Sequence, residues 1–171
     1  MKQISLLAKV SPHIRDNSST QRIMLDVIIA LCPAAVASAI IFGPRALLVI
    51  GVTTAASMAF EYLYCYFMKQ ENPVGDLSAA VTGILLAFNL PSTIPLWIAI
   101  LGSFVSIVIV KQLFGGLGRN FANPAIVGRI VLAISFAGRM TAYAYPKFDG
   151  GVDALASATP LVATQHADLP L

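Results

Sequence analysis

The most constraining feature of this sequence is a series of apolar runs that are almost free of charge. The first run, residues 23–42, contains a single charged side chain, Asp26. Hydrophobic residues make up 57% of the chain and charged residues only 11%, with a mean hydropathy of +0.80, whereas about a quarter of the residues in a soluble domain are charged. About 20 apolar residues in a helix cross the hydrocarbon core of a bilayer. The sequence therefore predicts an all-α integral membrane protein.

Five apolar segments are expected, and they divide the chain into three parts. Residues 1–22 form a basic N-terminal tail, residues 23–138 form the membrane domain, and residues 139–171 lie beyond it. The five segments are 23–42, 46–68, 77–90, 96–113 and 125–137. Because the third and fifth are short for a full crossing, we expect a multi-span helical bundle with short or broken helices.

The basic residues predict an orientation. If each segment crosses the membrane, most of them fall on the side of the N-terminus: Lys2, Lys9, Arg15, Arg22, Lys69, Lys111, Arg119 and Arg129. The positive-inside rule then places the N-terminal tail in the cytoplasm and residues 139–171 on the outer side. An even number of crossings would reverse the placement of residues 139–171.

A glycine-rich stretch interrupts the apolar runs between residues 111 and 129. Gly115, Gly116 and Gly118 allow positive φ angles and predict a tight turn. Asn123 followed by Pro124 predicts a helix start, with Asn at the N-cap and Pro at the first helical position. No strand is expected before the glycines, so the pattern does not indicate a nucleotide-binding loop.

Cys32 and Cys65 lie inside apolar runs and form no C-x-x-C pair or cluster with histidines. We interpret both as small buried residues and expect no metal site.

Three stretches carry a resemblance to a known family: Ser11-Pro-His-Ile-Arg15, residues 24–33 and the whole stretch 111–129. They resemble the RnfD family, the D subunits of the Rnf complex, which is a bacterial ferredoxin:NAD⁺ oxidoreductase that pumps ions. The chain is similar, more distantly, to the B subunit of the Na⁺-translocating NADH:quinone oxidoreductase. The resemblance implies a urea-transporter-like bundle in the bacterial inner membrane. It further implies one component of a redox-driven ion pump that is not catalytic alone.

Members of this family carry flavin mononucleotide (FMN) joined through its phosphate to a threonine. The attachment motif runs Asp, small residue, any residue, Ser/Thr, Gly/Ser, Ala, Thr. The residues that fit it are Asp153, Ala154, Leu155, Ser157, Ala158 and Thr159, while Ala156 departs at the hydroxyl position. The resemblance thus implies Thr159 as the attachment site, within a motif that includes Asp153, Ser157 and Ala158. On local chemistry alone, Thr159 and Pro160 would instead begin a further helix.

The resemblance also implies further cofactors and partners. Some members bind riboflavin without a covalent bond, and nothing local in this sequence identifies its pocket. The expected partners are the other Rnf subunits, including an outer FMN-bearing subunit and cytoplasmic iron–sulfur and flavin subunits, together with membrane lipid. No nucleic acid is expected. Family members continue beyond 171 residues, so we expect the chain to be an N-terminal half or a shortened form.

The ion path is less defined, and the translocated ion could be Na⁺ or H⁺. Asp26, Glu61 and Asp76 are ionisable residues at or near membrane depth, which makes them candidates for this path. For Asp26 and Asp76 the alternative is a place at a helix end. For Glu61 the alternative is an interfacial position among tyrosines.

Two other functions stay open. Asn123-Pro-Ala125 is also the signature of water and glycerol channels, which show it twice, whereas this chain shows it once. A passive channel or transporter is therefore the alternative to the redox role. A purely structural membrane anchor would tolerate a change at Thr159 without loss of electron transfer.

Overall fold

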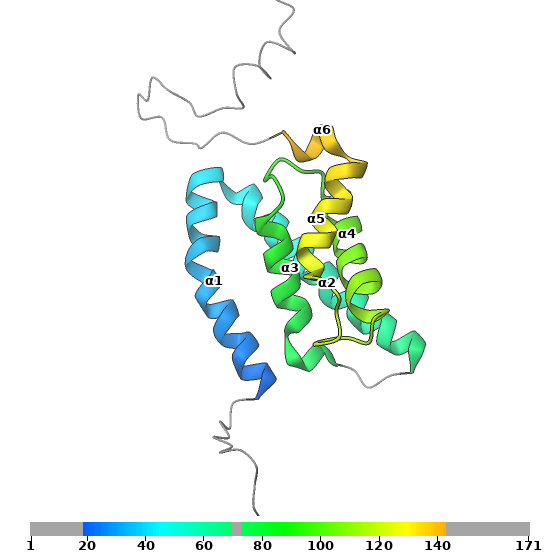
Figure 1. Ribbon diagram of the computed structural model, residues 1–171. Coiled ribbons are helices and arrows are strands. Elements are labelled where there is room, and N and C mark those ends of the chain that lie inside the picture. The colour runs from blue at the N-terminus through cyan, green and yellow to red at the C-terminus, as the bar shows by residue number, and fades with distance from the viewer. Residues whose placement is uncertain (1–18, 70–72, 143–171) are drawn as a thin grey trace, which may run out of the picture.

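A computed structural model describes residues 19–69 and 73–142, and within these ranges every regular element is a helix (Figure 1). The elements are α1 (Thr20–Phe42), α2 (Pro44–Met68), η1 (Pro73–Asp76), α3 (Ser78–Phe88), α4 (Leu96–Phe104), η2 (Val105–Gln112), α5 (Pro124–Ser135) and α6 (Ala137–Met140). Each of the five apolar segments expected from the sequence coincides, within three residues at either end, with α1, α2, α3, the continuous pair α4–η2 or α5.

Two of these helices, α1 and α2, are long and apolar enough to cross a membrane. At 23 and 25 residues, they rise roughly 34 and 38 Å, more than the thickness of a bilayer core of about 30 Å. Gly43 alone separates them, with φ at 86°, and α2 begins directly at Pro44. The sequence predicts a turn over residues 43–45, but Pro44 fits the first helical turn because it has no N–H to leave unpaired.

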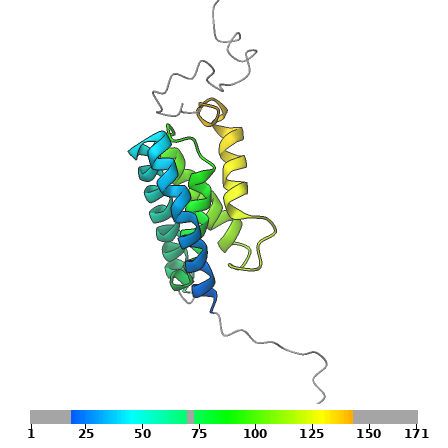
Figure 2. The same ribbon diagram turned by 90° about the vertical axis from the view of Figure 1, so that its left-hand side faces the viewer.

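The shorter helices pack around α2. Helix α3 and the continuous pair α4–η2 form the main contacts with α2, and α5 packs against α3, α4 and η2. Figure 2 shows α5 on the side of the bundle away from α1. The apolar core between these helices contains Leu86, Ile98, Leu132 and their neighbours.

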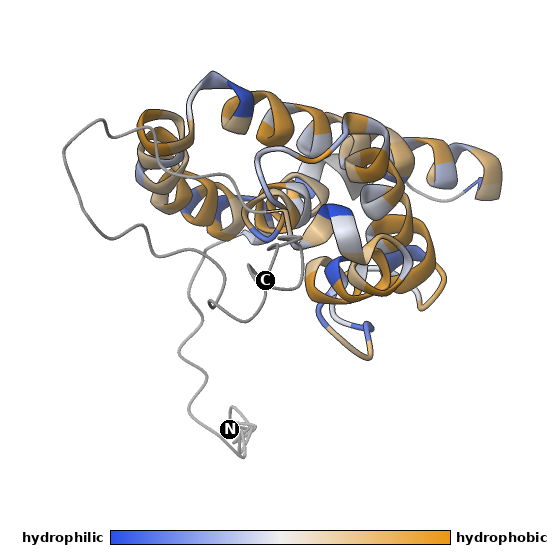
Figure 3. Ribbon diagram, turned by 90° about the horizontal axis from the view of Figure 1, so that it is seen from above, coloured by the Kyte–Doolittle hydropathy of each residue, from blue (hydrophilic) through white to orange (hydrophobic). Residues whose placement is uncertain are grey.

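One face of α2 is buried along its whole length. The buried residues recur at helical spacing: Ala46, Val49, Thr53, Ser57, Glu61 and Cys65. Four of these six carry polar or ionisable groups or a thiol, so α2 presents a polar stripe to the interior of the bundle. Helix α1, in contrast, has no buried residue, so Cys32 is exposed and the expectation that it is buried is wrong, whereas Cys65 is buried. Hydrophobic residues colour much of the helical ribbon in Figure 3, and many large apolar side chains are exposed.

The turn predicted around the glycines is present. Gly115, Gly116 and Gly118 have φ angles of 100°, 84° and 83°. The side chain of Asn123 accepts a hydrogen bond of 3.0 Å from the backbone N–H of Ala125, and Pro124 is the first residue of α5. Both local predictions for this stretch are confirmed: glycine readily adopts positive φ angles, and the short polar side chain of Asn caps the first turn of a helix.

Candidate functional site

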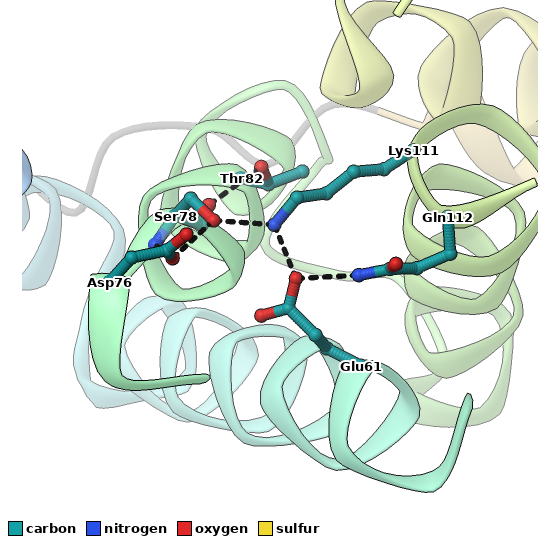
Figure 4. Close-up of polar contacts among 6 residues, drawn as sticks. All are labelled: Glu61, Asp76, Ser78, Thr82, Lys111 and Gln112. Atoms are coloured by element: carbon teal, nitrogen blue, oxygen red, sulfur yellow. Dashed lines mark hydrogen bonds and ion pairs between the residues drawn. The ribbon is translucent and has the colours of Figure 1, made fainter. Parts of the chain in front are cut away.

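The candidate site is a buried polar network where α2, α3 and η2 meet (Figure 4). Its centre is an ion pair: Lys111 Nζ lies 2.5 Å from Glu61 Oε1. The side chain of Glu61 is 0% exposed and that of Lys111 is 2% exposed. Charged groups are almost never buried to this degree unless they are paired.

Each charge has a second hydrogen bond. Gln112 Nε2 donates to Glu61 Oε1 at 2.8 Å, so two donors converge on this oxygen. Lys111 Nζ also donates to Ser78 Oγ at 2.6 Å. The two neutral side chains thus hold the charged pair from opposite sides, one from η2 and one from α3.

Ser78 links the ion pair to a second carboxylate. Its hydroxyl donates to Asp76 Oδ1 at 2.6 Å, and its backbone N–H donates to the same oxygen at 2.9 Å. The hydroxyl therefore accepts from Lys111 and donates to Asp76. A continuous chain of hydrogen bonds runs from Glu61 through Lys111 and Ser78 to Asp76 (Figure 4).

The π-helical winding of η2 places Lys111 and Gln112 in this site. The backbone N–H of Leu113 bonds the carbonyl of Val108, five residues earlier, at 3.1 Å. The buried positions of η2 repeat with the same period of five: Val105 and Val110, Ser106 and Lys111, Ile107 and Gln112. Such helices are rare and occur often at functional sites.

Three buried polar atoms at or near the pair have no hydrogen-bond partner within the described ranges. They are Glu61 Oε2, Ser57 Oγ and Ser106 Oγ. Ser57 lies one α-helical turn before Glu61, and Ser106 lies one π-helical turn before Lys111. Unpaired buried polar atoms are costly and call for an explanation in a native fold.

A cavity of about 340 Å³ reaches Lys111 from the glycine-rich turn. Its lining comes from α1, α3, the end of η2, the turn and the start of α5: Met24, Ser78, Val81, Thr82, Leu85, Lys111, Leu117, Gly118, Asn120, Ala122, Asn123 and Pro124. In the amide orientation that satisfies its surroundings, Asn120 donates to the carbonyls of Lys111 and Gly116, at 3.2 and 3.1 Å. The turn is thereby fixed to the end of η2 that carries the site.

A second cavity, of about 310 Å³, lies at the opposite end of α3 between α1, α2 and the 89–95 loop. Arg129 Nη1 donates to Asn89 Oδ1 at 2.9 Å beside it, and Arg45 Nε donates to the carbonyl of Ser92 at 3.1 Å. Arg129 therefore lies in the middle of α5 near the end of α3, and not beside the N-terminal tail as its place among the basic residues would suggest.

The acids named from the sequence have different surroundings. Glu61 is at the centre of the network, with no interfacial exposure among the tyrosines, and Asp76 is at its margin, where it also bonds the first residue of α3. Asp26 is exposed on α1 and is not part of the network. Asp153, Ser157, Ala158 and Thr159 lie outside the described residues.

Sequence reasoning misses Lys111, Gln112 and Ser78 as members of the site. Lys111 ends an apolar run, and a basic residue in that position is expected at the membrane edge. An acid within an apolar helix, such as Glu61, needs a partner in the bundle, and this need is the available signal. Among residues 19–69 and 73–142, no group of three or more His, Cys, Asp and Glu side chains could hold a metal ion.

Comparisons with known proteins agree on one family. A family model described as "NQR2, RnfD, RnfE family" matches residues 7–169. The chain is 45% identical over 161 residues to the D subunit of the Na(+)-translocating ferredoxin:NAD(+) oxidoreductase complex of Acetobacterium woodii, and the match covers 94% of this chain and 50% of that protein.

Two further relatives show similar agreement. The D subunit of the proton-translocating ferredoxin:NAD(+) oxidoreductase complex of Clostridium ljungdahlii is 41% identical over 151 residues, or 88% of this chain and 45% of that protein. The D subunit of the ion-translocating oxidoreductase complex of Cellvibrio japonicus is 39% identical over 148 residues, or 84% of this chain and 41% of that protein. The chain thus spans half or less of the length of these relatives.

Proposed function

The chain belongs to the NQR2, RnfD, RnfE family, and from this membership we propose that it is the D subunit of an ion-translocating ferredoxin:NAD⁺ oxidoreductase complex. The observation that carries the proposal is the 45% identity over 161 residues to a relative whose name states this activity. The two long apolar helices support a place in the bacterial inner membrane. Because the chain spans half of that relative, the activity is proposed for the complex and not for this chain alone.

The proposal includes FMN bound covalently to Thr159. Its support is the sequence motif, in which Asp153, Ser157 and Ala158 precede the threonine. The threonine hydroxyl would hold the phosphate, and the small residues around it leave room for the transferase that attaches the flavin. When bound, FMN accepts electrons and passes them on, while the protein supplies its position and electrostatic surroundings. A non-covalent riboflavin is proposed from the family alone, without a pocket.

The buried network is the proposed part of the ion path within this chain. Ionisable side chains inside a membrane bundle are costly to keep, so they are functional candidates by default. Glu61 and Asp76 are joined through Lys111 and Ser78, which gives a chain of charged and polar groups beside a cavity. Asp26 is exposed on α1 and lies outside this network, so its part in the path would depend on contacts beyond the described residues.

The relatives do not decide which ion is moved, since one is named Na(+)-translocating and another proton-translocating. The proposed partners are the other subunits of the complex, including an outer FMN-bearing subunit and cytoplasmic iron–sulfur and flavin subunits. The exposed apolar surface of α1 offers area for lipid or for such partners.

The test of the redox role is flavin fluorescence on a denaturing gel. The complete protein is produced together with a flavin transferase, as the wild type and as the Thr159→Ala and Thr164→Ala variants. Denaturation removes every non-covalent flavin, so we expect a fluorescent band for the wild type and for Thr164→Ala, and none for Thr159→Ala.

A band that persists in Thr159→Ala would move the attachment to another residue. No band in any of the three proteins would reject covalent flavin. The passive channel would then be the favoured alternative. Loss of the band only in Thr159→Ala would also exclude the purely structural role if electron transfer through the complex falls with it.

A further inference from the structure

Lys111 lies between two carboxylates that compete for its charge. It bonds Glu61 directly, at 2.5 Å, and reaches Asp76 through one hydroxyl, Ser78 Oγ, at 2.6 Å from its Nζ. The Lys side chain is long and flexible, with a compact point charge at its end. Rotation about its outer bonds would therefore move the ammonium group away from Glu61 and toward Ser78, whose hydroxyl is bonded to Asp76.

The Glu61 carboxylate has unused capacity to bind a cation. Oε1 accepts from Lys111 and Gln112, whereas Oε2, on a side chain that is 0% exposed, has no partner among the described residues. Ser57 Oγ, one turn earlier on the same face of α2 and also 0% exposed, is likewise unpartnered there. Residues four apart on a helix are neighbours, so Ser57 and Glu61 share one face of α2, where Ser57 Oγ lies next to Gly83 of α3.

Access to this region leads past Lys111. The cavity of about 340 Å³ is lined by Lys111 and Ser78 and by the glycine-rich turn. A hydrated cation entering from this turn would meet the ammonium group before it met Glu61. Lys111 thus blocks Glu61 and at the same time satisfies its charge.

We propose that Lys111 is a tethered cation that a Na⁺ ion displaces from Glu61, with Asp76 receiving the ammonium group through Ser78. This inference rests on the proposed ion-translocating function and names the residues of this chain that would bind the ion. The exchange breaks and forms no covalent bond. Glu61 exchanges one positive charge for another, Lys111 stays protonated, and its charge is then balanced by Asp76.

The donor set favours Na⁺ as the ligand. The vacant atoms are a carboxylate oxygen and a hydroxyl oxygen, and oxygen donors of this kind suit hard cations. A single carboxylate balances one positive charge, which favours a monovalent ion. A proton would need only one oxygen and would leave the Ser57 hydroxyl unexplained.

Competition between Lys111 and Na⁺ predicts opposite effects for two variants. If Glu61 is free of Lys111 for only about a tenth of the time, removing the ammonium lowers the half-saturating Na⁺ concentration about tenfold. The Lys111→Met variant is therefore expected to bind Na⁺ about tenfold more tightly. In Asp76→Asn the displaced lysine loses its second carboxylate, so Na⁺ is expected to bind several-fold more weakly.

The measurement is the Na⁺-dependent rise in the melting temperature of the assembled, purified complex. NaCl is titrated against choline chloride at constant ionic strength, since a ligand that binds only the folded state raises its stability. The proteins are the wild type, Lys111→Met, Asp76→Asn, Glu61→Gln, and the control Arg119→Gln, which removes an exposed cation of the same turn.

The expected order of half-saturating Na⁺ concentration is Lys111→Met below the wild type, with Arg119→Gln equal to the wild type and Asp76→Asn above it. Glu61→Gln is expected to lose the Na⁺ response. Equal half-saturating Na⁺ concentrations for Lys111→Met and the wild type would overturn the proposal. It would also be overturned if acid, and not Na⁺, raised the melting temperature of Lys111→Met. If Lys111→Met does not assemble, the direction of the Asp76→Asn shift decides.

This readout does not depend on redox activity. A complex that shows the predicted Na⁺ pattern but no ferredoxin:NAD⁺ activity would contradict the proposed function and keep the exchange site. A complex with that activity and without the Na⁺ pattern would contradict the exchange site and keep the proposed function. The carboxylates that face Lys111, directly or through Ser78, are Glu61 and Asp76.

Discussion

Ser78 is the residue on which the connection between the two carboxylates depends. Its hydroxyl is the only described group that bonds both Lys111 and Asp76. It is 4% exposed, so water cannot readily replace it. A change at this one atom should therefore separate the Glu61–Lys111 pair from Asp76 without removing any charge.

We predict that Ser78→Ala destabilises the protein by about 1.5–3 kcal/mol, the usual range for hydrogen bonds to charged groups. Lys111 and Asp76 each lose a partner, while the ion pair with Glu61 remains. The free energy of unfolding in mixed micelles is the measurement. Ser38→Ala is the control, because the Ser38 hydroxyl donates only to the carbonyl of Ala35 on its own helix, at 2.7 Å. An equal effect of both changes would contradict the role given to Ser78.

Helix α3 approaches α2 closely enough that one glycine decides their packing. A Cβ added at Gly83 would lie 2.7 Å from Thr54 Cα and 2.9 Å from the Thr53 carbonyl oxygen. Both atoms belong to the backbone and cannot turn aside. Small residues at such contacts let membrane helices pack tightly in the absence of a hydrophobic driving force. The same contact brings Ser78, at the start of α3, to the level of Glu61.

Gly83→Ala is therefore expected to destabilise the protein by about 1–3 kcal/mol through overpacking. Gly51→Ala in α2 is the matched change, since a Cβ there meets nothing within 4 Å. Alanine is favoured over glycine inside a helix by about 0.5–1 kcal/mol, so this variant should be neutral or more stable. Thermal unfolding of the two variants should move in opposite directions, and a loss of stability in both would indicate that the close contact is not the cause.

The π-helical winding of η2 is the feature of an individual helix that could not be predicted from the sequence. Helix positions follow from the apolar runs, and the Asn123–Pro124 start and the glycine turn follow from local rules that concern one or two residues. In contrast, the sequence Val105–Gln112 carries no local mark of a period of five. The winding lets Lys111 and Gln112 both contact Glu61, which lies 50 and 51 residues away in the sequence. Contacts at this separation cannot be predicted from the local sequence. Tertiary pairing of charges is the feature that sets η2 apart from an ordinary helix end.

At the scale of the whole molecule, the sequence names three candidate acids, of which the structure joins Glu61 and Asp76 in one network and leaves Asp26 outside it, and the sequence does not point to the cation between them. Glu61 and Asp76 stand out because acids at membrane depth are rare and costly. Lys111 is assigned to the membrane edge, because a basic residue at the end of an apolar run is typical of that position. Only the packing of η2 against α2 shows that it lies inside the bundle. The flavin motif at residues 153–159 remains a prediction from the resemblance.

Opposite ends of the bundle present two exposed arginines that can report its orientation. Arg119 lies in the glycine-rich turn and Arg139 in α6, and α5 separates them (Figure 1). With 12 residues, α5 rises only about 18 Å, less than the roughly 30 Å of a bilayer core. The connecting residues must therefore cover the remaining depth if the two ends face opposite compartments.

We predict that a cysteine at Arg119 faces the cytoplasm and a cysteine at Arg139 the outer side, as the distribution of basic residues indicates. Each would be introduced singly after Cys32 and Cys65 are replaced by alanine, and intact cells would be treated with a membrane-impermeant maleimide. Arg139→Cys should react in intact cells, and Arg119→Cys only after the membrane is opened. Reaction of both in intact cells, or of neither, would mean that α5 re-enters on one side, and the Thr159 segment would then require a different compartment.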